Sequence, residues 1–418
     1  MRIAIFTDTF LPKIDGVAIS IYQFTNILAA KGHHFLICAP KYSDDEILQH
    51  ELHPNIEILR FKSAPLPSYP EVKIVLPSQK KLRYVAKEFR AELIHLQTPG
   101  LMGQYGLFIS RFYQIPMVGT YHTLISEQEM YISLYRLLNI DKLADYILLG
   151  RRIKKNLEKI EKKVTSSFKK ALLWKYANNF YENCEVIITP TELIRRELVE
   201  KGVKKTIEVI SNGIDFQMFQ GVPKEQLNQP PKLIHVGRIS YEKNCDVILK
   251  AFYEIKKHIP GVTLDIYGDG PALRSLKIEA RYLNIQDSVF FHGFVDRKEL
   301  TKIYPKFDIF LTASTMETQG LVVLEAMASG LPCVGVNSFA LPELIQNDIN
   351  GYTVEPGNHK QIAEKTIEIL KNPEKFKKFS QNSIEIARKH DIYESARKLE
   401  VLYEQVIEDF QKEKSFFK

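Results

Sequence analysis

The sequence predicts an α/β protein of two domains, each built on a parallel β-sheet with helices on both faces. The chain has 418 residues, which is too long for one hydrophobic core and suits two domains of about 200 residues. Short apolar runs alternate with longer amphipathic segments in both halves, as expected of βαβ units. Residues 217–231 are rich in Gln, Asn and Pro, which indicates a linker between the halves.

Composition narrows the class of protein but does not select a partner. Hydrophobic residues make up 45% of the chain and charged residues 26%, which is ordinary for a globular protein. No apolar run approaches the ~18–20 residues of a membrane-spanning helix, and the chain enters its first strand without a signal-peptide pattern. The four cysteines are far apart, so we expect buried thiols rather than a metal or redox site. The net charge of +7 suggests an anionic partner, which could be a nucleotide, a nucleic acid or a membrane.

The N-terminal half begins as a strand (3–7), a helix (17–30) and a second strand (35–39). The loop 8–16 follows the first strand, and open α/β sheets bind ligands at the carboxyl ends of their strands. Gly16 at the helix start would let a ligand approach the backbone, or it is simply a turn glycine.

Further strands are predicted at 56–61, 93–96 and 117–120, and a histidine comes directly after the last of them. A lone histidine is usually structural. His122, however, lies at the carboxyl edge of the predicted sheet, which makes it the best site candidate of this half.

Two basic amphipathic segments stand out in the N-terminal half. Residues 125–181 are predicted to be a largely helical insertion in which lysines and arginines between 150 and 176 adjoin apolar and aromatic residues. Residues 79–90 repeat this pattern after an apolar, proline-containing loop. Such helices are either solvated surface helices or lie in a membrane interface, with their cations on anionic headgroups. We favour the membrane over nucleic acid, because no nucleic-acid-binding module is recognisable.

The second half opens with a strand at 232–236, and two cations follow it directly. Arg238 and Lys243 lie between this strand and the next helix, where they could hold a diphosphate, Arg as a fork of donors and Lys as a point charge. The alternative is a basic surface turn paired with Glu242. The next strand, 263–267, runs into Gly268-Asp269-Gly270-Pro271, which a tight turn suffices to explain.

Residues 307–336 are predicted to form strand, loop, helix and strand, and they carry two acids in unusual places. The loop ends at Gly320, so the amides of Gly320 and Leu321 could face a phosphate at the helix start. Glu317 lies in the loop. Glu325 lies on the packing face of the helix, where burial without a partner would be costly. A polyhydroxyl ligand would supply that partner.

Glu317 and Glu325, followed by Gly330-Leu331-Pro332, resemble the paired-glutamate signature of retaining GT-B glycosyltransferases of family 4. The resemblance covers most of the chain and implies a GT-B fold, with two Rossmann-like α/β/α domains facing a central cleft. We therefore expect an acceptor- and membrane-binding domain at 1–216, with its insertion at 125–181, and a nucleotide-sugar domain at 217–390. A helix at 391–418 is expected to return to the N-terminal domain.

The resemblance also implies roles for single residues. Arg238 and Lys243 would hold the diphosphate of a UDP-sugar with the amides at Gly320 and Leu321, and Gly16 would add a backbone contact. Glu325 would accept hydrogen bonds from the ribose. Glu317 would bind hydroxyls of the sugar, and His122 would line the donor-sugar site. No metal ligand and no tightly bound cofactor are expected, with Mg²⁺ at most a stimulant.

Within the family, the segments 8–12, 15–20 and 317–321 look most like bacterial 1,2-diacylglycerol 3-glucosyltransferases. This likeness implies retaining transfer of glucose from UDP-glucose to the 3-hydroxyl of 1,2-diacylglycerol, giving an α-monoglucosyl lipid. The enzyme would be peripheral on the cytoplasmic face of the cell membrane. The alternatives are a family-4 enzyme with another UDP-sugar, or with a glycolipid, polysaccharide or small-molecule acceptor, and a non-catalytic sugar-nucleotide- or membrane-binding protein on the same scaffold.

Overall fold

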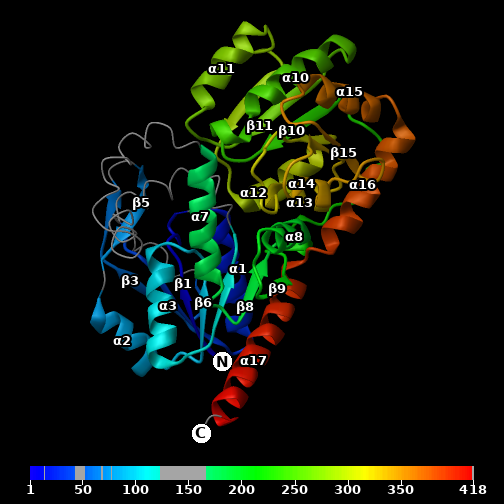
Figure 1. The fold of residues 1–418 in the computed structure, drawn as a ribbon. Coiled ribbons are helices and arrows are strands. Elements are labelled where there is room, and N and C mark those ends of the chain that lie inside the picture. The colour runs from blue at the N-terminus through cyan, green and yellow to red at the C-terminus, as the bar shows by residue number, and fades with distance from the viewer. Residues whose placement is uncertain (14, 43–51, 67–68, 77, 123–165, 417–418) are drawn as a thin grey trace, which may run out of the picture. The chain divides into compact units, whose positions relative to one another are not determined.

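The computed structural model describes residues 1–13, 15–42, 52–66, 69–76, 78–122 and 166–416, and the chain divides into two compact units (Figure 1). Unit 1 contains residues 1–190, 195–210 and 396–418, and unit 2 contains residues 191–194 and 211–395. Most of the predicted helical insertion, from 125 to 165, lies outside the described residues.

Unit 1 is built on a seven-stranded parallel sheet of order β3-β2-β1-β6-β7-β8-β9. Its central strands are buried on both faces, which explains why they read as continuous apolar runs in the sequence. The strands are β1 (Arg2–Phe6), β2 (His34–Pro40), β3 (Ile56–Phe61), β6 (Leu93–Leu96), β7 (Met117–Thr120), β8 (Val186–Thr189) and β9 (Thr206–Val209).

The predicted proline-containing loop before residue 79 is wrong in part, because it holds a two-stranded antiparallel sheet. Strands β4 (Ser63–Leu66) and β5 (Tyr69–Val75) pair with an irregularity between Pro65 and Leu66. Proline is tolerated there because a two-stranded sheet consists only of edge strands.

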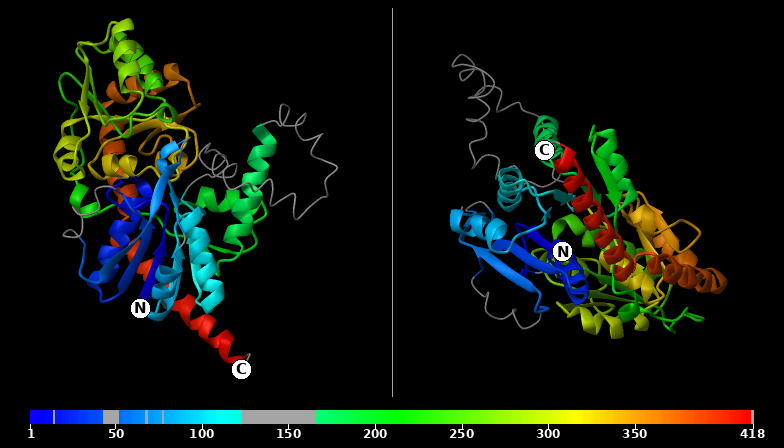
Figure 2. Two further views of the ribbon diagram at one scale, coloured as in Figure 1. Left: turned by 90° about the vertical axis from the view of Figure 1, so that its left-hand side faces the viewer. Right: turned by 90° about the horizontal axis from the view of Figure 1, so that it is seen from below.

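Helices of unit 1 connect and cover these strands, as the two further views in Figure 2 show. They are α1 (Gly16–Ala30), α2 (Gln79–Lys87), α3 (Leu101–Tyr113), α7 (Ser166–Tyr181) and, from Arg195 onward, α8 (Glu192–Glu200).

The long C-terminal helix α17 (Ile392–Phe416) belongs to unit 1 from Ala396 onward. Leu399, Leu402 and Tyr403 on this helix are buried in the same core cluster as Ile3 of β1. Glu400 also binds Lys31 at 2.5 Å. Apolar burial is therefore what holds the C-terminal helix against a sheet formed almost entirely by the first half of the chain.

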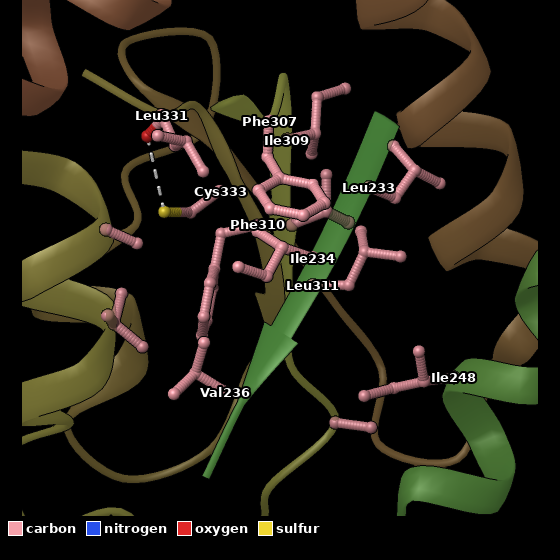
Figure 3. Close-up of a cluster of buried hydrophobic side chains, with 14 of the residues drawn as sticks. Leu233, Ile234, Val236, Ile248, Phe307, Ile309, Phe310, Leu311, Leu331 and Cys333 are labelled. Atoms are coloured by element: carbon pink, nitrogen blue, oxygen red, sulfur yellow. Dashed lines mark hydrogen bonds between the residues drawn. The ribbon is translucent and has the colours of Figure 1, made fainter. Parts of the chain in front are cut away.

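Unit 2 is built on a six-stranded parallel sheet of order β12-β11-β10-β13-β14-β15. Its centre is a dense apolar core in which Leu233, Ile234 and Val236 of β10 lie beside Ile309 and Phe310 of β13 (Figure 3). The strands are β10 (Lys232–Val236), β11 (Thr263–Tyr267), β12 (Val289–Gly293), β13 (Ile309–Leu311), β14 (Cys333–Val336) and β15 (Gly351–Val354).

The helices of unit 2 are α9 (Phe216–Phe219), η4 (Tyr241–Lys243), α10 (Cys245–His258), α11 (Leu273–Tyr282), α12 (Arg297–Ile303), η5 (Tyr304–Lys306), α13 (Leu321–Ala328), α14 (Leu341–Leu344), α15 (His359–Leu370) and α16 (Pro373–Arg388). The main part of unit 2 begins at Ser211, before the predicted linker, because Ile214, Phe216 and Phe219 are buried in its core. Across the described ranges, no helix is both long and apolar enough to span a bilayer.

Candidate functional site

The chemistry-bearing residues of unit 2 follow β10 and β13, the two strands at the middle of its sheet. The chain runs from β10 outward to β11 on one side and returns on the other side as β13. This change of direction is a topological switch point, where open parallel sheets bind ligands at the carboxyl ends of their strands. Arg238 and Lys243 follow β10, and Glu317 and Glu325 follow β13. Residues that are far apart in sequence thus come to the same edge of one sheet.

Lys243 and Glu317 form an ion pair across this edge. Their Nζ and Oε1 atoms are 2.5 Å apart, and the side chains are 22% and 16% exposed. Asn244 fixes the two loops to each other, since its Nδ2 donates to the carbonyl of Ala313 at 3.2 Å. Asn244 adopts a positive φ of 49° to begin α10. The alternative of a surface turn paired with Glu242 is therefore wrong for Lys243. Glu242 instead accepts from the hydroxyl of Ser240.

Arg238 lies in the same loop, with an exposed side chain. The turn that follows β11 packs against this loop, and only glycine fits at two positions of that turn. A Cβ on Gly268 would lie 1.8 Å from the carbonyl oxygen of Gly237, and one on Gly270 would lie 2.3 Å from that of Ile239. The amide of Ile239 also donates to the backbone carbonyl of Asp269 at 2.9 Å. The Gly-Asp-Gly turn thus supports the loop that carries the two cations.

Helix α13 has an N-terminus without a side-chain cap. Gly320 is its N-cap residue, in the left-handed region at φ 78°, and Gln319 instead contacts the amide of Asn212 at 2.8 Å. By contrast, Asp15, Asp296 and Asn358 cap helices α1, α12 and α15 with their side chains. The first amides of α13, at Leu321 and Val322, can therefore donate to an anion, whereas those of Val323 and Leu324 donate to the carbonyl of Gly320.

Glu325 lies inside the unit rather than at its surface, at 4% exposure. Its partners are Arg297, whose Nε donates to Oε1 at 2.6 Å, and the hydroxyl of Tyr304, 3.4 Å from Oε2. Burial raises the pKa of the Glu325 carboxyl, and the Arg297 guanidinium opposes this shift. Arg297 follows β12 closely in the sequence, a position typical of site residues, but it was not among the predicted site residues.

Two buried polar atoms near these residues lack a hydrogen-bond partner within the described part of the chain. They are Nη2 of Arg297 and the hydroxyl of Ser314, which follows β13. Unsatisfied buried polar atoms are rare in folded proteins and are expected where a ligand completes the set. Among the described residues, no group of three or more His, Cys, Asp and Glu side chains is arranged to hold a metal ion.

In unit 1 the switch point lies between β1 and β6. His122 follows β7, the next strand, and is 6% exposed, with its Nε2 bound to Oε1 of Gln97 at 2.5 Å. Burial lowers the pKa of His122 to about 4, so its ring is neutral at pH 7. Nδ1 of His122 is buried and has no partner among the described residues. It is a bare acceptor that a ligand hydroxyl could use.

Gly16 begins α1, and a Cβ there would meet nothing within 4 Å, so packing does not require glycine at this position. The neighbouring Asp15 caps the helix, accepting from the amide of Ala18 at 2.9 Å. Its carboxylate therefore already uses the Ala18 amide at the start of α1.

Two parallel-sheet α/β units with polar residues at their switch points define the GT-B class of glycosyltransferases, and solved structures support this assignment. An Anabaena protein, HepE, in complex with UDP aligns with a TM-score of 0.74 at 18% identity, covering 97% of this chain and 100% of that one. Sucrose-phosphate synthase from Thermosynechococcus elongatus aligns with a TM-score of 0.75 at 19% identity, covering 97% and 99%. The predicted fold is confirmed.

Sequence comparison then places the chain within the class. Residues 14–217 match the model of Glycosyltransferase Family 4, and residues 220–386 match that of Glycosyl transferases group 1. The alpha-monoglucosyldiacylglycerol synthase of Streptococcus pneumoniae is 31% identical over 363 residues, covering 84% of this chain and 74% of that protein. The enzyme of the same name from Acholeplasma laidlawii is 27% identical over 429 residues, covering 98% of each. The chain belongs to glycosyltransferase family 4.

Proposed function

We propose that this glycosyltransferase moves glucose from UDP-glucose to the 3-hydroxyl of 1,2-diacylglycerol with retention of configuration. The observation that carries the proposal is the Lys243–Glu317 pair at the switch point of unit 2. In this proposal Lys243 binds a phosphate of the donor and Glu317 binds hydroxyls of its sugar, and the two side chains are in contact. The names of the two relatives from S. pneumoniae and A. laidlawii support the lipid acceptor.

In this proposal the diphosphate of the donor lies over the loop after β10. Arg238 and Lys243 neutralise it, and the uncapped amides at Gly320 and Leu321 donate to its oxygens. Negative charge on the diphosphate grows as its bond to the sugar breaks. These groups therefore stabilise the transition state more than the bound donor. The HepE complex with UDP is consistent with a nucleotide donor of this kind.

Glu325 binds the ribose of the donor in this proposal. A carboxylate offers about four acceptor positions, so Glu325 can accept from ribose hydroxyls while it keeps Arg297 and Tyr304. The Arg297 guanidinium favours the charged form, which accepts hydrogen bonds best. Nη2 of Arg297 is then available for the nucleotide as well.

The reaction proceeds on the sugar face that the diphosphate leaves. The acceptor hydroxyl forms a bond to the anomeric carbon as the bond to the β-phosphate oxygen breaks, and the departing phosphate takes the hydroxyl proton. Glu317 accepts hydrogen bonds from sugar hydroxyls and stabilises the positive charge that develops at the anomeric carbon. His122 accepts a hydrogen bond from a sugar hydroxyl at its bare Nδ1.

A surface on unit 1 fits a lipid acceptor, because it combines exposed aromatic rings with cations. Phe108 and Phe112 lie one turn apart on α3, stack at 5.7 Å between ring centroids, and are 55% and 67% exposed. The ring of Tyr113 contacts that of Phe112. Nζ of Lys87 on α2 lies over the Tyr113 ring, 5.3 Å from its centroid. Contiguous patches of exposed apolar side chains are uncommon on monomeric proteins and are typical of interfaces.

Helix α2 turns its cations outward beside these rings. Leu82 and Val85 are buried, whereas Lys80, Arg83 and Lys87 are exposed. A pair of interfacial helices inserts aromatic rings into the headgroup region and places its cations on neighbouring anionic headgroups. We therefore assign the lipid contact to this aromatic–basic face of α2 and α3.

The described end of the second basic segment is engaged with the protein instead. Trp174 of α7 stacks on Tyr121 at 6.1 Å and lies under Lys201 at 3.6 Å, and Tyr176 donates to the carbonyl of Pro99 at 2.7 Å. These aromatic rings are not turned to a membrane. Residues 150–165 of the segment lie outside the described residues.

Replacing Phe108 and Phe112 with serine should weaken binding to vesicles of phosphatidylglycerol and phosphatidylcholine by about 10- to 100-fold, because two partly buried rings leave the interface. Co-sedimentation measures the change. Tyr282→Ser is the matched control, since this ring is 85% exposed on α11 of unit 2. Equal binding of the double variant and the wild type would refute the assigned face.

The function itself is tested by thin-layer chromatography of lipids after the purified protein is incubated with labelled UDP-glucose and diacylglycerol in mixed micelles. A labelled monoglucosyl lipid is the expected product. Transfer only from another UDP-sugar, or only to another acceptor, would leave a family-4 transferase but overturn the substrate assignment. UDP-sugar binding without any turnover would favour a non-catalytic binding protein.

A further inference from the structure

A chain of buried hydrogen bonds in unit 1 connects the C-terminal helix to His122. The hydroxyl of Tyr403 on α17 lies 2.6 Å from Nδ1 of His95 on β6. Nε2 of His95 lies 3.1 Å from Nε2 of Gln97 and 2.7 Å from the hydroxyl of Thr120. Oε1 of Gln97 lies 2.5 Å from Nε2 of His122. These side chains are all at most 6% exposed.

The direction of each hydrogen bond follows from the groups involved. Oε1 of Gln97 can only accept, so Nε2 of His122 carries a proton and donates to it. The amide nitrogen of Gln97 can only donate, so Nε2 of His95 is bare. A neutral His95 then carries its proton on Nδ1 and donates to Tyr403. The orientation of the Gln97 amide therefore couples the tautomers of the two histidines.

Both rings stay neutral at pH 7, since burial lowers the pKa of His95 to about 3 and that of His122 to about 4. A neutral imidazole has two tautomers, and the hydrogen bond at one nitrogen selects between them. In His122 the proton on Nε2 leaves Nδ1 bare, and Nδ1 is the ring nitrogen without a partner among the described residues.

We infer that Tyr403, His95 and Gln97 are positioning residues that hold His122 as an acceptor at Nδ1, turned to a hydroxyl of the substrate. The inference rests on the proposed contact between His122 and the donor sugar. It gives α17 a part in the reaction, because Tyr403 comes from a segment 308 positions after His95. Without the Tyr403 hydroxyl, the proton on His95 loses its acceptor. The opposite arrangement of these hydrogen bonds, in which the Gln97 amide is flipped and each histidine carries its proton on the other ring nitrogen, then competes with the original one.

The test is Tyr403→Phe, which keeps the ring that packs edge-on against His95 at 5.6 Å and removes only the hydroxyl. Protein labelled with ¹⁵N-histidine is compared by long-range ¹H–¹⁵N NMR, with the His122 signals assigned from His122→Gln. The wild type should show a protonated Nε2 and a bare Nδ1 at this residue. In the variant the two signals should move toward each other as the second tautomer becomes populated, and kcat/KM for UDP-glucose should fall by about tenfold.

Tyr105→Phe is the matched control, since the Tyr105 hydroxyl donates to the carbonyl of Val75 at 3.0 Å, away from this chain. It should leave the His122 spectrum unchanged. A second variant, Gln97→Met, should give the same shift in tautomer as Tyr403→Phe. If His122→Gln transfers sugar at the wild-type rate, the proposed contact with the donor is wrong. If that variant is inactive while Tyr403→Phe changes neither the spectrum nor kcat/KM, the chain only fastens α17 to the sheet, and the inference is overturned.

Discussion

Glu317→Gln is expected to lower kcat/KM for sugar transfer by about a hundred- to a thousandfold, because a neutral amide cannot stabilise positive charge at the anomeric carbon. The substitution preserves shape but removes the charge that pairs with Lys243 at 2.5 Å. Lys243 then has the diphosphate as its anionic partner, so binding of UDP should be retained or strengthened. Steady-state kinetics with UDP-glucose and diacylglycerol, beside calorimetric titration with UDP, separates the two effects.

Glu242→Gln is the control for charge alone, since Glu242 adjoins Lys243 in the sequence but is exposed and accepts from Ser240. We expect it to stay within about threefold of the wild type. A Glu317→Gln enzyme that is equally active would remove Glu317 from the reaction. The Lys243–Glu317 pair would then be a structural ion pair only.

Lowering the pH from 7 to 5 is expected to remove about 2 kcal/mol of unfolding free energy for each of three buried histidines. Burial lowers the pKa of His95 to about 3 and those of His122 and His235 to about 4, from 6.5. Between pH 6.5 and about 4 the unfolded chain binds protons that the folded chain does not. Stability therefore falls as the pH falls, and it is fully present only above pH 6.5.

Urea unfolding at pH 7, 6 and 5 measures this slope. The single tryptophan, Trp174, reports on unit 1, which holds two of the three histidines, and circular dichroism reports on both units. Asp8 and Glu325 act in the opposite sense, because burial raises their pKa values. His235→Gln isolates the contribution of one histidine. The slope of the unfolding free energy of unit 2 against pH should fall by the equivalent of about one proton taken up on unfolding. An unfolding free energy that does not change between pH 7 and 5 would contradict the prediction.

Much of the fold was predictable because strands that are buried on both faces read as apolar runs. The strands at 93–96 and 117–120 were predicted with the bounds that the structure has. The hairpin of β4 and β5 was missed, because Pro65 and Pro70 argue against strands unless both strands are known to be edges. Edges are a property of the sheet and cannot be read from one segment.

The sequence by itself determined the class of protein and where its candidate residues lie, because strand ends, Gly320 and the spacing of Glu317 and Glu325 are local features. Only the tertiary structure decided what each residue contacts. The two glutamates look alike in the sequence, yet Glu317 pairs with Lys243 at the edge of the sheet, while Glu325 is buried against Arg297. His122 is likewise linked through Gln97 and His95 to Tyr403, far along the chain. Periodicity reports which face of an element is buried, whereas contacts between distant segments follow from strand order and packing, which no local pattern contains.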